Sequence, residues 1–145
     1  MCLLIEIDMP GVPREAAGDV TRAIGRQGLL ALRAQRTPKG HAGARFLLET
    51  GEGCACGLLA DNADWDVPAY RLASDSMPQL ERLLAEVTSA AGAQGFHLRA
   101  VWVTGGLDGI PARAERSVRW TELRQEVRGA QIGSNVRYHV TGTPA

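Results

Sequence analysis

The sequence is poor in cysteine, in aromatic residues and in lysine. Its 145 residues include three cysteines, 5% aromatic residues, and a single lysine among 16 basic residues. An odd, small number of cysteines does not suit a disulfide framework, so we expect free thiols in a reducing compartment. The apolar start of the chain has no positively charged stretch before it. We therefore expect no signal peptide and predict a cytoplasmic location.

The chain also lacks net charge and long apolar runs. Its formal net charge is zero at pH 7, so the whole molecule has no field that attracts nucleic acid or an anionic membrane. No apolar run approaches the roughly 20 residues of a membrane helix. The arginines are not interleaved with aromatic residues as on an RNA- or DNA-binding face. We predict neither a nucleic-acid partner nor a membrane partner.

The composition is that of a soluble globular protein. Hydrophobic residues make up 45% of the chain and charged residues 22%, which is ordinary for a packed domain. A chain of this length supports one hydrophobic core and is too short for two ordinary domains. We assign residues 1–140 to a single α+β domain and residues 141–145 to a flexible tail.

Hydrophobic periodicity predicts the main helices and strands. Short apolar or alternating runs indicate strands, and apolar residues at helical spacing indicate helices. In chain order, we expect a strand over 2–7, a helix from 13, strands over 29–34 and 45–49, an extended stretch over 54–59, a helix from 76 and a strand over 96–103. Ser76 and Gln79 have the spacing of a capping box at the start of the second helix.

This order is that of a ferredoxin-like βαββαβ sandwich, in which two helices cover one face of an antiparallel sheet. A further helix from 121 and a strand over 136–140 extend it. The strand over 96–103 places Val101 and Val103 on the face away from the helices. Because an exposed apolar face needs a cover, we predict a homodimer.

The most distinctive motif is Cys54-Ala-Cys56, bracketed by glycines. In a strand both thiols point to the same side and can meet one soft cation. Zinc prefers about four ligands, so this pair alone is not a site. His97 and His139 are the residues that could complete a set. No metal is expected, since the alternative, buried cysteine acting as a small hydrophobe, needs no ligand.

Three aromatic residues are candidates for a ligand pocket near the cysteines. Trp65 and Tyr70 lie in an irregular acidic stretch, and Trp102 lies on a strand. Large rings in such places either fill the core or line the mouth of a pocket. Glu6 and Asp8 lie next to the first strand, and we expect both to be solvated at the surface. No phosphate-binding or EF-hand motif is complete, so no cofactor is predicted.

Three functions follow from these patterns. The favoured one is a small ligand- or partner-binding module, because no catalytic constellation is recognisable. The first alternative is a thiol or metal-binding protein that uses Cys54 and Cys56. The second alternative is a small enzyme with one of these cysteines as nucleophile and His97 as base. The sequence does not identify a ligand, a substrate or a reaction.

Overall fold

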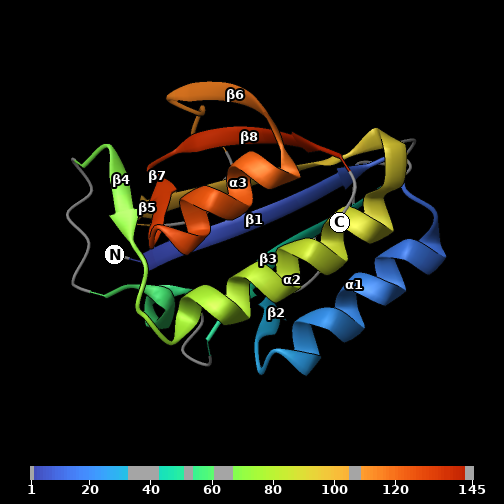
Figure 1. Ribbon diagram of the computed structural model, residues 1–145, viewed down its shortest axis with the longest axis horizontal. Coiled ribbons are helices and arrows are strands. Elements are labelled where there is room, and N and C mark those ends of the chain that lie inside the picture. The colour runs from blue at the N-terminus through green and yellow to red at the C-terminus, as the bar shows by residue number, and fades with distance from the viewer. Residues whose placement is uncertain (1, 33–42, 51–53, 61–66, 105–108, 143–145) are drawn as a thin grey trace.

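The computed structural model describes residues 2–32, 43–50, 54–60, 67–104 and 109–142. The chain contains both helices and strands (Figure 1). They are β1 (Cys2–Pro10), α1 (Arg14–Arg26), β2 (Leu30–Leu32), β3 (Gly43–Glu49), η1 (Cys56–Leu58), β4 (Ala69–Arg71), α2 (Ser76–Ala91), η2 (Gly92–Gln94), β5 (Phe96–Val103), β6 (Ala114–Arg119), α3 (Trp120–Arg128), β7 (Gln131–Gly133) and β8 (Val136–Thr141).

The strands form a mixed sheet of six in the order β2-β3-β1-β5-β8-β6, and β4 pairs with β7 in a separate ribbon. The pairs from β2 to β8 are antiparallel, whereas β6 runs parallel to β8. The predicted α+β class is confirmed. Within the described ranges, no helix has both the length and the apolar character needed to cross a membrane.

The main core lies between one face of the sheet and the three α-helices, all of which lie on that face (Figure 1). Successive residues of a strand point to opposite faces, so alternate residues of β1 and β5 enter this core. The core residues of these two strands are Leu3, Ile5, Ile7, Met9, Phe96, Leu98 and Ala100. Their neighbours along the same strands face away from the helices. These neighbours build the site.

Three local predictions were wrong. The stretch over 54–59 contains the 3-10 turn η1 rather than a continuous strand. Strands β4, β6 and β7 were not expected. The helix α2 begins after Asp75 with no side-chain cap. Ser76 is buried in its first turn, and the Gln79 amide instead donates to the carbonyl oxygen of Gln27, at the end of α1.

The second face of the sheet is partly covered by the chain itself. Leu4, Leu47, Val101 and Val103 form a small apolar cluster there, and Ile110 from the β5–β6 connection packs against it. Val101 and Val103 are each only 5% exposed. The reason given for a homodimer, an uncovered apolar face at these two valines, therefore does not hold. Charged side chains of β1, β3, β5 and β8 lie on the same face, among them Glu6, Arg45, Arg99 and Arg137.

Candidate functional site

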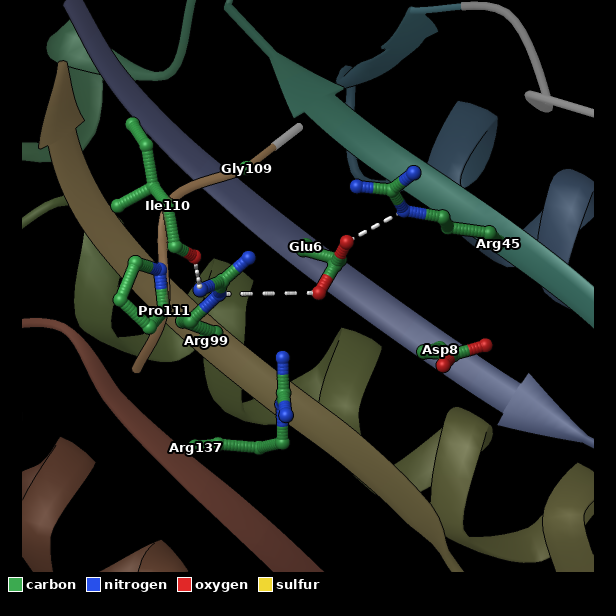
Figure 2. Close-up of a pocket in the computed structure, with 8 residues that line it drawn as sticks. All are labelled: Glu6, Asp8, Arg45, Arg99, Gly109, Ile110, Pro111 and Arg137. Carbon is green, nitrogen blue, oxygen red and sulfur yellow. Dashed lines mark hydrogen bonds and ion pairs between the residues drawn. The ribbon is translucent and has the colours of Figure 1, made fainter. Parts of the chain in front are cut away.

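A charged cavity of about 610 Å³ lies on the second face of the sheet. Figure 2 shows that charged side chains from four adjacent strands and the backbone of the β5–β6 connection line it. The lining residues are Glu6, Asp8, Arg45, Arg99, Gly109, Ile110, Pro111 and Arg137. Strand register brings the charged residues together, because cross-strand partners share a face. Glu6 is opposite Arg99, which is in turn opposite Arg137.

The centre of this arginine cavity is a buried ion pair. Glu6 is 6% exposed and Arg99 is 3% exposed, so the expectation that Glu6 is solvated was wrong. The Glu6 carboxylate is paired with Arg45, and its Oε1 lies 3.8 Å from Arg99 Nε. Arg99 Nη1 donates to the carbonyl oxygen of Ile110 at 2.7 Å. These contacts hold the Arg99 side chain in place against the floor of the cavity (Figure 2).

Arg99 nevertheless keeps an unused donor. Its Nε is buried and has no hydrogen-bond partner among the residues that the structure describes. The 3.8 Å separation from Glu6 is too long for a hydrogen bond. Burial lowers the pKa of Arg99, and the Glu6 carboxylate opposes that effect. A buried guanidinium donor without a partner is costly, and this one is directed at the Glu6 carboxylate (Figure 2).

The cavity carries a surplus of positive charge. Three guanidinium groups, of Arg45, Arg99 and Arg137, face two carboxyl groups, of Glu6 and Asp8. The pKa of Asp8 is raised, chiefly by burial and next by the nearby Glu6 carboxylate. Burial and the Glu6 carboxylate thus disfavour the charged form of Asp8 relative to a solvated carboxyl. The cavity can bind an anionic group through Arg99 and Arg137.

Two histidines stand next to the cavity on β5 and β8. His97 is paired across the strands with His139, and their ring centroids are 4.2 Å apart. The pKa of His97 is lowered, first by burial and then by His139. His139 Nε2 lies 3.7 Å from Glu115 Oε1. The rings therefore form a tilted pair, with an interplanar angle of 60°, beside Asp8, which is opposite His97 on β1.

The aromatic candidates line a different cavity, of about 540 Å³. Tyr70 and Trp102 both lie on its wall, and the Tyr70 hydroxyl accepts a hydrogen bond from the Trp102 backbone N–H at 2.9 Å. The third candidate, Trp65, falls outside the described residues. Ile110 and Pro111 line both cavities. The β5–β6 connection therefore borders both the arginine cavity and this aromatic cavity.

The two predicted cysteines do lie together, and Cys2 joins them. The sulfur atoms of Cys2, Cys54 and Cys56 all lie within 4.8 Å of one another. The two histidines of the predicted metal set are not near them. Cys2 is opposite Val103 at one end of the β1–β5 pair, and His97 is opposite Asp8 at the other. Six residues of strand separate these positions, which is about 20 Å, so one ion cannot contact both groups.

The Cys56 thiol is not activated for nucleophilic attack. Burial, followed by the hydrogen bond with Cys54, raises the pKa of Cys56 to about 11. We expect iodoacetamide at pH 7 to alkylate Cys56 of the reduced, metal-free protein roughly 10-fold or more slowly than a model thiol, because the thiolate is the reactive form. Mass spectrometry of the labelled peptide measures this rate. A rate equal to that of the model thiol would instead favour the cysteine-nucleophile enzyme.

Sequence reasoning missed the arginine cavity. Glu6 and Asp8 were recognised only as carboxylates next to a strand, and Arg99 was not recognised as a site residue. A charged residue that alternates with apolar residues in a strand was the available signal. Which residues of β3 and β8 lie beside Arg99 depends on strand order and register, and the sequence alone did not supply these.

Comparison with known proteins gives no relative from which a function can be carried over. A scan against protein-family models, a search of the curated proteins and a search of the solved structures found no match. The chemistry of the described side chains therefore carries the functional proposal.

Proposed function

We propose that the protein is a binding module for a small anionic molecule, held in the arginine cavity. One observation carries this proposal: the guanidinium groups of Arg45, Arg99 and Arg137 line the cavity together with two carboxyl groups, of Glu6 and Asp8, so its lining has a surplus of positive charge. Arginine suits this role because its planar donors match carboxylate and phosphate oxygens. The ligand class is a carboxylate or a phosphate.

The size and charge of the cavity support the same proposal. Its volume of about 610 Å³ lies in the range of roughly 300–1,000 Å³ that small-molecule sites occupy. Arg137 is only partly exposed and is paired with Glu115 at 3.3 Å. Its guanidinium points into the cavity (Figure 2). Arg99 would provide a fixed donor, and Arg137 a more accessible one.

We further propose that residues 2–103 form a ferredoxin-like unit. The order β2-β3-β1-β5, with all neighbours antiparallel, supports this assignment. The second face of this unit would then be the ligand face, with β8 and the β5–β6 connection completing its wall. The homodimer and the cytoplasmic location stay predictions, and neither is needed for the site.

Replacement of Arg137 with glutamine is expected to weaken anion binding roughly 10-fold, which corresponds to the loss of one charge-assisted hydrogen bond. The probes are inorganic phosphate and malonate, titrated into the protein at constant ionic strength and followed by calorimetry. Arg137 suits the test better than Arg99, because a partly exposed arginine can be replaced with less risk to folding.

Arg128→Gln is the matched control. Arg128 lies on α3, is half-exposed and pairs with Glu81, so the substitution removes one arginine charge far from the arginine cavity. We expect Arg128→Gln to bind phosphate and malonate with affinities within a factor of two of those of the unmodified protein, a change of about 0.4 kcal/mol. Equal losses in the two variants, or no binding of either probe to the unmodified protein, would contradict the proposal.

A further inference from the structure

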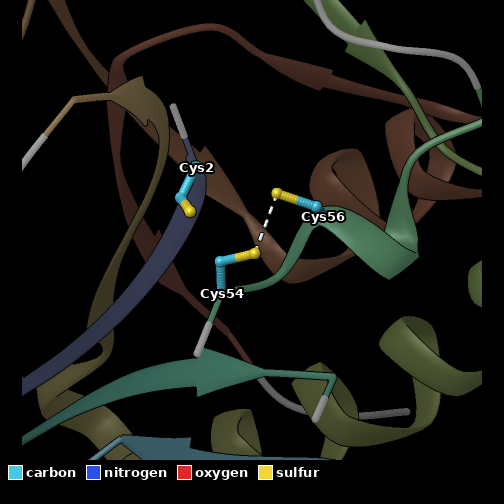
Figure 3. Close-up of side chains that lie close together, drawn as sticks. All are labelled: Cys2, Cys54 and Cys56. Carbon is cyan, nitrogen blue, oxygen red and sulfur yellow. Dashed lines mark hydrogen bonds between the residues drawn. The ribbon is translucent and has the colours of Figure 1, made fainter. Parts of the chain in front are cut away.

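The three cysteines of the chain form a cluster at the other end of the sheet from the histidine pair. Cys2 begins β1, while Cys54 and Cys56 lie in the segment that leads into η1 (Figure 3). Cys54 Sγ is 2.9 Å from Cys56 Sγ, and the Cys2 sulfur lies within 4.8 Å of both. Residues more than 50 positions apart in sequence thus bring all the thiols to one point.

Backbone hydrogen bonds hold this cluster together. Ala55 N–H donates to the Leu3 carbonyl oxygen at 2.9 Å, and Cys54 accepts a bond from Thr50 N–H at its carbonyl, also at 2.9 Å. Leu3 N–H donates to Cys56 Sγ at 3.2 Å. The segment that carries Cys54 and Cys56 is therefore fixed against β1, with the sulfurs converging.

Burial as small hydrophobic residues does not account for the whole cluster. Cys54 is buried, but Cys2 and Cys56 are only partly so. A disulfide between Cys54 and Cys56 would also leave the Cys2 thiol unused. Three converging sulfurs, two of them on partly exposed residues, match what a thiophilic cation requires.

We propose that Cys2, Cys54 and Cys56 bind one thiophilic d10 cation, Zn²⁺ or Cu⁺, through three thiolates. On binding, three S–H bonds break, three metal–sulfur bonds form and three protons leave to solvent, with no change of oxidation state. Zinc–sulfur bonds of about 2.3 Å place tetrahedral ligand sulfurs about 3.8 Å apart. The cluster reaches that spacing by small side-chain rotations. Because protons are released, affinity should rise with pH.

The test uses the reduced protein under anaerobic conditions, with Zn²⁺ and Cu⁺ each competed against a chromophoric chelator. We expect one equivalent of at least one metal to bind. Each of the single variants Cys2→Ser, Cys54→Ser and Cys56→Ser should bind that metal at least 10-fold more weakly. Serine at position 56 keeps an acceptor for Leu3 N–H, and circular dichroism checks that each variant is folded. Absorption spectroscopy at the metal edge of the unmodified protein should show three sulfur neighbours.

The matched controls are His97→Gln and His139→Gln, which alter the two other candidate ligands of the sequence-based set. We expect both to leave metal affinity unchanged, because the histidines lie at the far end of β5. The proposal is overturned if neither metal binds, if Cys2→Ser binds as tightly as the unmodified protein, or if the histidine variants lose affinity too. Anion binding to the arginine cavity is measured separately, so either site can fail without the other.

Discussion

Replacing Glu6 with alanine is expected to lower the free energy of unfolding by about 3–5 kcal/mol, the usual cost of removing one partner of a buried ion pair. Glu6 is 6% exposed and is the counter-charge of Arg99, which is 3% exposed. Without Glu6, a guanidinium that water barely reaches keeps its charge and loses its nearest carboxylate. Urea unfolding at pH 7, followed by circular dichroism, measures the change.

An exposed ion pair provides the control for the Glu6 substitution. Asp19 and Arg22 pair one helical turn apart on α1, and each side chain is 64% exposed. Asp19→Ala should cost less than about 1 kcal/mol, because water already solvates both charges. If Glu6→Ala also lowers the free energy of unfolding by less than about 1 kcal/mol, Arg99 is not desolvated. That result would contradict the description of the arginine cavity as a site built around a buried ion pair.

The Glu6 variant also reports on the proposed function. Removing this carboxylate leaves the cavity more positive and its deepest arginine unpaired, so an added anion should bind more tightly there. We expect 100 mM phosphate to raise the stability of Glu6→Ala by more than that of the unmodified protein. Sodium chloride at matched ionic strength distinguishes a bound anion from general screening.

Replacing Gly95 with alanine is expected to lower the free energy of unfolding by about 3 kcal/mol or more, through backbone strain and a direct clash. Gly95 precedes β5 with a φ of +71°, and a Cβ atom there would lie 2.2 Å from the carbonyl oxygen of Val140 on β8. Relief of this clash requires β5 and β8 to separate where Phe96 pairs with Val140. Urea unfolding again measures the loss.

Gly92 is the matched control for Gly95. It lies three residues earlier with a similar φ of +62°, but nothing lies within 4 Å of the position its Cβ would take. Gly92→Ala should therefore lower the free energy of unfolding only through backbone strain, by about 1–2 kcal/mol. If the two variants lose equal stability, the close approach of Gly95 to β8 is not what limits this position.

The parts of the fold that were predictable from sequence are those with a clear hydrophobic period. The alternation along β5 correctly separated Phe96 and Leu98 from Arg99 and Val101, because successive residues of a strand point to opposite faces of the sheet. The helix α2 was predictable from its helical period, because Leu80, Leu83, Leu84 and Val87 recur at helical spacing and all enter the core.

The missed elements lack that signal. Strand β6 has a single buried residue, Val118, among exposed polar ones, as an edge strand can. It is held by parallel pairing with β8, and the sequence of β6 has no pattern that indicates this pairing. The strands β4 and β7 each have three residues, too few for a period to show.

The two candidate sites differ in how far the sequence indicated them. Cys54 and Cys56 are close in sequence, so two of the three thiols of the cluster could be predicted together. Cys2 joins them only through contacts of β1. The arginine cavity was not visible at all, since Arg45, Arg99 and Arg137 come from three separate strands. Their convergence is a property of strand order and register.

The most direct measurement of anion binding in the arginine cavity is the side-chain Nε–H spectrum of the arginines by nuclear magnetic resonance, recorded during titration with phosphate. The Nε–H signal of Arg99 should move saturably, together with that of Arg137, while that of Arg128 stays in place. An Arg99 signal that does not move, or arginine signals that all drift together without saturation, would contradict the account.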